Sequence, residues 1–526
     1  MPVNTDDVIP TTAPVIDEDA PDAPISVPDS GDTGEGGKLK MIVQLVKKSL
    51  GVKDIAAMRL SLPASLLEPL PNLEYWNYLD RPDLFASIND SHDAFERMLA
   101  VVRFTFTKDL KFVHGKVCKP YNSVLGEHFR SHWDVPPVRY SSDPTNPPIF
   151  GTHTTDTHSA PASTIALPLE TLSIRSGRSA HSSKSTRSGL SLLSKTKASP
   201  STAPTSPHQA PEAGLAGHMS RLSLGPDGSD SDTVRVVYIT EQVSHHPPIS
   251  AYYATCPARS VEMIGVDQIS AKVSGTTLRV APGSHNKGIF INITGGAGGG
   301  ESYHITHPVA SVNGILRGSF YITVADSTII TCTGGRGEEN YRAVIEYKEE
   351  SWLGRAHFLV EGVIHTYDED SMEHEEWTKA KHVPQSRVVA VFDGCWRNHI
   401  RWRRTASSSN DSLSSTPEYH TLIDLSKLHV VPKVVRPLEK QVPNESRKLW
   451  ESVTTRLLNK EYGEATKHKL VIEQKQRDEA SERKRKGEEF IPRYFDKDIS
   501  SGAPILTAEG RKAVEEELRE RCSETP

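Results

Sequence analysis

The sequence predicts a mainly β protein of the α+β class, with an antiparallel sheet or barrel at its centre and helices toward both ends. Three observations support this class. Short runs of β-branched and aromatic residues, separated by Gly, Pro, Asn and Asp, follow one another from residue 233 to 367. Residues 446–490 are rich in Glu, Lys, Arg, Gln and Leu, which favour helix. Residues 40–50 place their apolar side chains on one helical face.

Composition excludes several functional classes. The chain has 526 residues, and 61 Lys plus Arg against 67 Asp plus Glu give a net charge of −6. A balance so near neutrality does not suggest a nucleic-acid binder. The five cysteines include no C-x-x-C pair, which argues against a disulfide framework or a zinc site. No apolar run approaches about 18 residues, so we expect neither a membrane span nor a secretory signal.

Two segments lack the apolar content of a folded core. Residues 1–37 hold nine acids, six prolines and no Lys or Arg, and we expect a disordered acidic tail. No Phe, Trp or Tyr occurs between Phe150 and Tyr238, where Ser, Thr and Pro dominate. Residues 138–232 are therefore predicted to be a disordered insertion. It is either a solvated spacer or a target for kinases and weak contacts with anionic membranes.

The helix predicted over residues 40–50 has an apolar face and lysines away from it. Gly51 follows where a helix commonly ends. This helix either packs on a core or acts as a movable amphipathic flap that touches membranes. Its apolar face consists of Met41, Ile42, Leu45 and Val46.

Eight strand-like runs indicate the antiparallel sheet or barrel. They span residues 234–240, 249–255, 276–282, 288–294, 314–324, 327–333, 341–347 and 357–367. The glycine-rich segment 294–300 is predicted to be a loop, because no Gly-Lys-Ser/Thr follows it.

Three polar clusters could bind a ligand. EQVSHHPP (241–248) places two imidazole donors, His245 and His246, before two prolines; a pair of histidines alone is often a chance feature. KPYNSVLGE (119–127) offers a cation and an amide that suit an anionic, oxygen-rich group, or simply forms a turn. The third cluster, on one face of the C-terminal helix, is either a salt-bridge ladder or a phosphate-binding face, and it consists of Lys469, Glu473 and Arg477.

Enzyme signatures are absent from the sequence. There is no H-E-x-x-H, no G-x-S-x-G and no P-loop. We therefore predict a protein that holds a phosphate rather than one that hydrolyses it, with no cofactor and no metal.

These segments together resemble the family of oxysterol-binding protein (OSBP)-related lipid-transfer proteins. EQVSHHPP is the fingerprint of the family, and KPYNSVLGE is similar to its K-P-x-N-x-x-L-G-E segment. ESRKLWESVT, the later K-x₃-E-x₃-R helix, LPASLLEP, VEGVIHTYDED and FIPRYFDKD also occur in the expected order. The resemblance covers about residues 40–135 and 233–500.

The resemblance implies a short-form member with one lipid-binding domain, residues 38–500, interrupted by 138–232 and followed by a C-terminal tail, 501–526. The fold would be an incomplete antiparallel β-barrel around an apolar lipid tunnel, with an N-terminal helical lid and C-terminal helices. Such proteins extract a lipid from one membrane and deliver it to another. Many exchange a sterol or phosphatidylserine for phosphatidylinositol 4-phosphate.

The resemblance also assigns residues. Lys119 and Asn122 would bind headgroup phosphate, His245, His246 and Arg477 would hold the 4-phosphate, and Lys469 with Glu473 would meet the inositol. The tunnel mouth and lid would consist of Met41, Ile42, Leu45, Val46, Leu62 and Leu66. We expect a cytoplasmic monomer, peripherally bound at endoplasmic reticulum, Golgi or plasma membrane contact sites. The alternative is a sensor or scaffold that binds phosphoinositide or sterol without transporting it.

Overall fold

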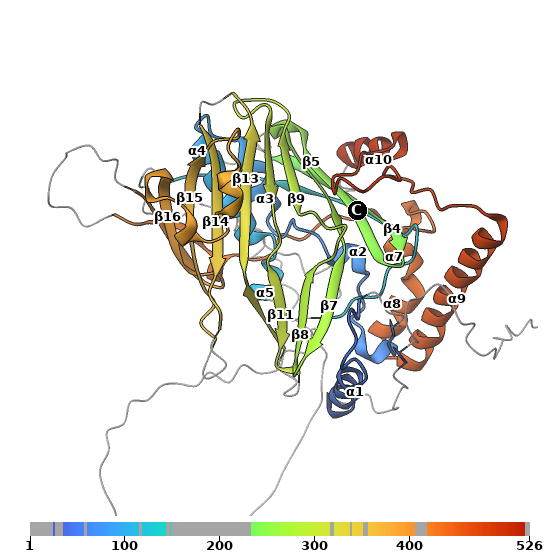
Figure 1. Ribbon diagram of the computed structural model, residues 1–526. Coiled ribbons are helices and arrows are strands. Elements are labelled where there is room, and N and C mark those ends of the chain that lie inside the picture. Colours follow the sequence, from blue (N-terminus) through green and yellow to red (C-terminus); the bar gives the residue numbers. More distant parts are fainter. Residues whose placement is uncertain are drawn as a thin grey trace, which may run out of the picture. The chain divides into compact units, whose positions relative to one another are not determined.

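Figure 1 shows a computed structural model of the protein. The residues that the structure describes all belong to one unit of the chain. They are 25–26, 35–56, 60–114, 118–141, 143, 148, 233–315, 320–336, 339–350, 356–405 and 418–520. Most of the predicted acidic tail and of the predicted insertion lies outside these residues.

A twelve-stranded antiparallel sheet dominates the fold, as the β-rich sequence predicts. All eight predicted strand runs contribute to this sheet or to the smaller one described below. In spatial order its strands are β18 (His420–Asp424), β17 (His399–Arg404), β16 (Val388–Cys395), β15 (Leu359–Tyr367), β14 (Asn340–Tyr347), β13 (Ser327–Gly334), β10 (Glu301–Ile305), β9 (Ile289–Ile293), β6 (Val261–Asp267), β5 (Pro248–Cys256), β4 (Val234–His245) and β3 (His128–Val135).

A four-stranded sheet extends the large one. Each of its strands adjoins in sequence a strand of the large sheet, and the lateral order is the same in both. Four long strands therefore bend and run through both sheets, as Figure 1 shows for β7, β8 and β11. Asp326, with a φ of +66°, lies at the bend between β12 of the smaller sheet and β13 of the large one. The strands are β12 (Tyr321–Ala325), β11 (Val309–Asn313), β8 (Thr277–Pro282) and β7 (Ile269–Ser274).

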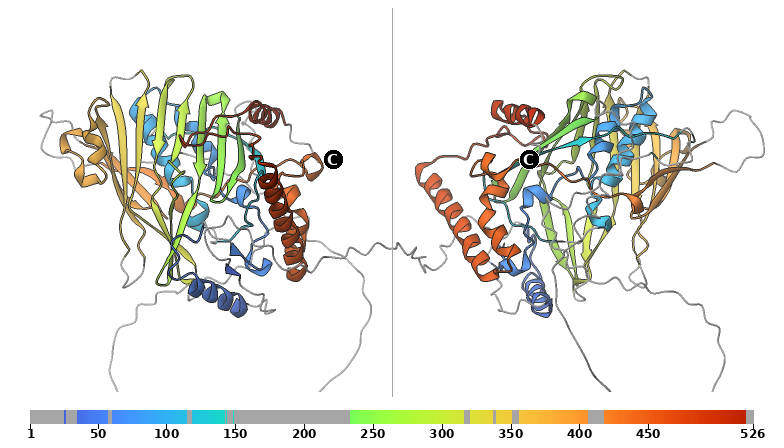
Figure 2. Two further views of the ribbon diagram at one scale, coloured as in Figure 1. Left: turned by 45° about the vertical axis from the view of Figure 1, so that its right-hand side comes forward. Right: turned by 180° about the vertical axis from the view of Figure 1, so that it is seen from behind.

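Helices from the first part of the chain cover one face of the large sheet (Figure 2). The longest is α4, which Asp93 caps by accepting a hydrogen bond from the Glu96 amide at 3.1 Å. Most of its side chains are buried, including Phe95, Leu99 and Phe104, and they form the main core with the strands. The four helices are α2 (Asn72–Tyr75), α3 (Pro82–Ala86), α4 (Ala94–Thr107) and α5 (Lys111–His114).

A C-terminal segment rather than a strand ladder covers the free edge of β3. His132 and Val434 exchange backbone hydrogen bonds of 3.0 and 2.8 Å, and the Trp133 indole donates to the Val431 carbonyl at 3.1 Å. In the described part of the chain no ladder joins β18 to β3. The sheet is therefore an open one, its β3 edge covered by the chain that runs from β18 toward the C-terminal helices.

The predicted C-terminal helical region contains α7 (Ser446–Leu449), α8 (Glu451–Leu458) and α9 (Tyr462–Lys486). α9 ends at Gly487, whose φ of +66° is the left-handed conformation that glycine tolerates. A fourth helix, α10 (Ala508–Arg519), packs Ala513 and Val514 on β4 residues. No helix among the described residues is long and apolar enough to cross a membrane.

α10 corrects the boundary at residue 500, because the segment expected to be a tail contains a packed helix. The N-terminal boundary also shifts, since α1 (Glu35–Lys48) begins inside the predicted acidic tail of residues 1–37. Within that tail, β1 (Ile25–Ser26) pairs in parallel with β2 (Leu60–Ser61). The predicted helix over 40–50 is thus present but starts earlier and ends two residues sooner.

Candidate functional site

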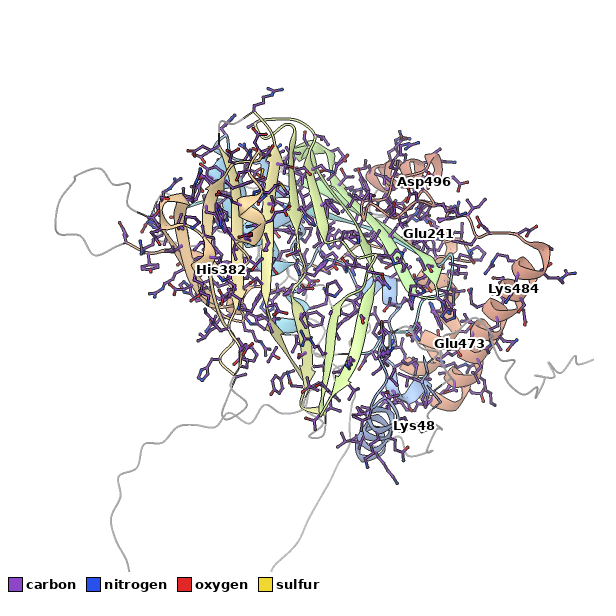
Figure 3. The ribbon with its side chains drawn as sticks, viewed as in Figure 1. Lys48, Glu241, His382, Glu473, Lys484 and Asp496 are labelled. Atoms are coloured by element: carbon purple, nitrogen blue, oxygen red, sulfur yellow. The ribbon has the colours of Figure 1, made fainter. Side chains whose placement is uncertain are left out.

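The three polar clusters singled out from the sequence meet in one region. The loop of residues 119–127 lies between the end of β4 and helix α9. Figure 3 labels Glu241 on β4 and Glu473 on α9, on the same side of the molecule. The contacts that join the three segments are Gly126 N to Gln242 O (2.9 Å), Gln242 N to Glu127 O (2.8 Å) and Leu125 N to Gln476 Oε1 (3.1 Å).

Lys119 and Asn122 are held together within the loop. The Lys119 ammonium donates to Asn122 Oδ1 at 2.6 Å and to the Pro120 carbonyl at 2.9 Å. Burial, and then the neighbouring charge of Lys469, lower the pKa of Lys119 to about 8. Two partly desolvated ammonium groups thus lie close to each other, which favours a ligand that brings negative charge.

Helix α9 turns the face of its cationic cluster toward this loop. Lys469 is buried, and its ammonium lies 2.5 Å from Glu473 Oε1. Arg477 is half-buried, and its Nε and Nη2 donate to Gln474 Oε1 at 3.2 and 3.0 Å. The expected i, i+4 contact therefore exists between Lys469 and Glu473, while the Arg477 guanidinium contacts Gln474.

His245 and His246 lie at the end of β4, where the strand is irregular between Gln242 and Ser244. This irregularity and the following turn bring the two rings within 4.6 Å, at an interplanar angle of 65°. Burial, and then His246, lower the pKa of His245 to about 4, so its imidazole is neutral at pH 7. A neutral imidazole donates one N–H, which can hydrogen-bond a phosphate oxygen.

Two buried glutamates in the motifs connect these segments to the C-terminal part. Glu127 accepts hydrogen bonds from Ser446 Oγ (2.7 Å), Trp450 Nε1 (3.1 Å) and the Val124 amide (3.1 Å). Burial raises its pKa to about 7, although the Ser446 and Trp450 bonds oppose that shift. Sequence reasoning missed this role, for which the only signal was an acidic residue beside apolar ones.

Glu241 does the same for β4. Its two carboxylate oxygens accept from the amides of Arg493 and Tyr494, at 2.8 and 2.7 Å. The FIPRYFDKD segment is thereby fastened to the strand that leads to the histidine pair.

In the loop, Gly126 has a φ of +77°, and a Cβ there would lie 3.2 Å from the ring of Phe490. Glycine is therefore required at that position.

Three of the predicted lid and mouth residues, Leu45, Leu62 and Leu66, pack beside the same loop. Met41 and Leu62 are buried, and Ile42 and Val46 are half-buried. Leu45 and Leu66 pack in a cluster that includes Tyr121 of the loop and apolar residues of α8 and α9. The Glu68 amide donates to the Lys119 carbonyl at 2.9 Å. The structure thus joins the segment of Leu62 and Leu66, and Leu45 of α1, to the loop that carries Lys119 and Asn122.

The chain after α1 is fastened to the edge of the smaller sheet. Asp54 Oδ1 accepts from the amides of Ala271, on β7, and Ala56, at 2.8 and 2.9 Å. The Ile55 amide donates to the Ala271 carbonyl at 2.7 Å. α1 therefore leads directly into an anchored segment.

Among the described residues, no group of three His, Cys, Asp or Glu side chains could hold a metal ion.

Comparison with known proteins identifies the family of the chain. A sequence profile of the oxysterol-binding protein family matches residues 41–169 and 228–517. Oxysterol-binding protein-like protein 1 of Schizosaccharomyces pombe is 46% identical over 495 residues, which cover 92% of each chain.

Two solved structures share the fold. The crystal structure of the Osh1 ORD domain in complex with cholesterol has a TM-score of 0.54 and 18% identity, covering 90% of this chain and 89% of that one. The Osh3 ORD in complex with PI(4)P from Saccharomyces cerevisiae has a TM-score of 0.50 and 15% identity, covering 95% and 96%. The predicted fold class is confirmed. The chain belongs to the oxysterol-binding protein family of lipid-binding and lipid-transfer proteins, which are not enzymes.

Proposed function

We propose that this chain is an intermembrane lipid transfer protein that carries one lipid at a time and exchanges a sterol or phosphatidylserine for phosphatidylinositol 4-phosphate. The observation that carries the proposal is the convergence of loop 119–127, the end of β4 and one face of α9. These segments are far apart in sequence, yet together they present ammonium, guanidinium, amide and imidazole donors.

The charge of the site supports a phosphate ligand. Lys119, Lys469 and Arg477 carry three positive charges against the one carboxylate of Glu473. A phosphomonoester carries about −1.5 to −2 at neutral pH and offers three strong acceptor oxygens. Hydrogen bonds between charged groups are about twice as strong as neutral ones, so such a ligand would offset the desolvation of the two lysines.

The apolar part of the lipid requires a cover during transit. Apolar surface costs roughly 25 cal/mol per Å² to expose to water. α1 contributes Leu45 to the cluster beside the site and buries Met41, which suits a lid over the bound lipid. The ligands of the two similar structures, cholesterol and PI(4)P, fit a sterol and a phosphoinositide as the exchanged pair.

The place of action follows from the same proposal. A carrier that visits two bilayers would act as a monomer in the cytoplasm and bind membranes peripherally, at contacts of the endoplasmic reticulum with the Golgi or the plasma membrane.

A shared site makes the two lipids mutually exclusive. A gradient of phosphoinositide would then drive the second lipid against its own gradient. Simultaneous saturable binding of both lipids by one molecule would contradict the exchange.

The test is the double substitution His245→Ala with His246→Ala. We expect it to abolish extraction of phosphatidylinositol 4-phosphate from liposomes, because both imidazole donors are lost. The fold and most binding of the other lipid should be retained. His382→Ala is the matched control, since His382 is exposed and far from the site in Figure 3. Unchanged extraction by the double variant would refute the headgroup assignment.

The alternative is a non-transporting sensor or scaffold. It is tested by following lipid movement between two liposome populations. A carrier accelerates transfer in both directions, whereas a scaffold binds lipid and leaves the transfer rate at the value without protein.

A further inference from the structure

Ser123 lies within the loop that holds Lys119 and Asn122, but its hydroxyl takes no part in holding that loop. The side chain is 6% exposed, and Oγ has no hydrogen-bond partner among the described residues. A buried hydroxyl without a partner is costly and is uncommon in folded proteins. A hydrogen bond to a ligand would satisfy this hydroxyl.

The loop around Ser123 is already fixed by its neighbours. Asn122 accepts from Lys119, the Val124 amide donates to Glu127, and the Leu125 amide donates to Gln476. Alanine at residue 123 would leave all of these contacts in place. The hydroxyl is consequently free of a structural task in the loop.

A second unpartnered polar atom belongs to the same region. His245 Nδ1 is also buried without a hydrogen-bond partner in the described part of the chain. The Ser123 backbone is in hydrogen-bond contact with the His245 ring, and this contact opposes the lowering of the His245 pKa. Two buried polar groups from different segments, loop 119–127 and β4, thus both lack partners at one junction.

We propose that Ser123 is a ligand of the phosphomonoester, its Oγ–H donating a hydrogen bond to the same phosphate that His245 binds. The inference rests on the proposed function and adds a residue to that site. The site then has two sides. Ser123 and His245 supply uncharged donors, and Lys119, Lys469 and Arg477 supply positive charge. A hydrogen bond from an uncharged donor depends on the direction of the acceptor oxygen. A phosphomonoester offers three free oxygens and a diester only two, so these donors favour the monoester.

The test is Ser123→Ala in the full chain. Affinity for a short-chain, water-soluble phosphatidylinositol 4-phosphate, measured by titration calorimetry, should fall about tenfold, the loss expected for one hydrogen bond to a charged group. Affinity for short-chain phosphatidylinositol, which lacks the monoester, should stay the same. The thermal unfolding midpoint of the free variant should equal or exceed that of the wild type, because an unsatisfied buried hydroxyl has been removed.

Ser131→Ala is the matched control. Ser131, on β3, is fully buried with an unpartnered Oγ as well, but it lies on a sheet strand away from the loop. This variant should leave both affinities unchanged.

Four results would overturn the inference. The first is wild-type affinity of Ser123→Ala for the phosphoinositide, and the second is an equal loss for both lipids. The third is a clear drop of the unfolding midpoint, which would show that the hydroxyl has a partner in the free protein. The fourth is inorganic phosphate binding as tightly as the short-chain lipid, which would assign the site to free phosphate. Failure of the wild type to bind phosphatidylinositol 4-phosphate would instead refute the proposed function itself.

Discussion

Single residues at the candidate site combine charge with burial. Lys119 and Lys469 are distant in sequence but close in the fold. Each has a polar partner, Asn122 for Lys119 and Glu473 for Lys469. The two buried glutamates, Glu127 and Glu241, fix the loop and β4 by accepting hydrogen bonds from protein groups. Their hydrogen bonds explain why acidic residues occur in motifs whose other polar residues suit an anion.

The lowered pKa of Lys119 predicts how binding depends on pH. Its pKa in the folded protein is about 8, compared with 10.5 for an ordinary lysine. As the pH rises through 8, the ammonium loses its charge, so affinity for an anionic headgroup should fall progressively. Calorimetric titration with short-chain phosphatidylinositol 4-phosphate across this range measures the effect. Lys119→Ala should bind more weakly and show a flatter profile; a profile as steep as that of the wild type would assign the effect to another group.

Stability of the ligand-free protein should follow the opposite trend. Below pH 8 Lys119 is charged in both the folded and the unfolded state, and the folded state carries the full desolvation cost. Between pH 8 and 10.5 the folded state releases this proton before the unfolded one does, so the contribution of Lys119 to the free energy of unfolding rises across that window.

At the scale of the element, α1 is the part that both the sequence and the structure single out. The 3.6-residue period placed Met41, Ile42, Leu45 and Val46 on one face, and the structure buries or half-buries all four. The period could not show that Leu45 packs in a cluster with Tyr121 of the loop, because that cluster joins segments distant in sequence. The two alternatives, core helix or flap, differ only in whether the packing is reversible.

Removal of residues 1–50 tests whether α1 acts as a lid. Bound lipid should then dissociate at least severalfold faster, because the apolar face of α1 no longer covers it. Stopped-flow transfer of a fluorescent lipid to acceptor liposomes measures this rate. A shorter deletion, of residues 1–24, leaves β1 and α1 intact and should dissociate like the wild type. Equal rates for the longer deletion would show that α1 is a fixed part of the core.

At the scale of the whole molecule, C-terminal segments complete the open sheet. The segment around Val431 and Val434 covers the edge of β3, and α10 covers the outer side of β3 and β4. Glu517 of α10 is fully buried and contacts His132 (2.8 Å), Arg130 (3.2 Å) and Arg436 (3.3 Å). One carboxylate thus joins a strand, the edge segment and the last helix.

This network ties α10 to the sheet. Glu517→Ala should lower the free energy of unfolding by about 1–3 kcal/mol, because buried donors lose the carboxylate that they share. Both arginines keep a second counter-charge, Arg130 in Glu516 and Arg436 in Glu445. Urea denaturation followed by tryptophan fluorescence measures the change. Glu515→Ala is the control, since Glu515 is exposed and forms only a surface pair with Arg519, at 3.2 Å. A loss no larger than that of the control would mean that α10 is not needed for the domain.

The sequence by itself determined the β-rich class, the positions of eight strand runs, the amphipathic helix near the N-terminus and the three polar clusters. These follow from local signals, namely side-chain alternation, helical period and dense polar spacing. Eight strands of the two sheets lie outside these runs: β3, β6, β7, β10, β11, β16, β17 and β18. Most of them are short or rich in polar residues; β17, for example, has six residues, of which three are arginines.

Only the tertiary structure decided which clusters meet, which acids are buried, and that α10 belongs to the domain. These features depend on backbone hydrogen bonds and ion pairs between residues more than a hundred positions apart, such as Gln242 with Gly126 and Glu517 with Arg130. No local pattern records such contacts, because the free energy that selects them comes from burial shared by segments that meet only in the folded chain.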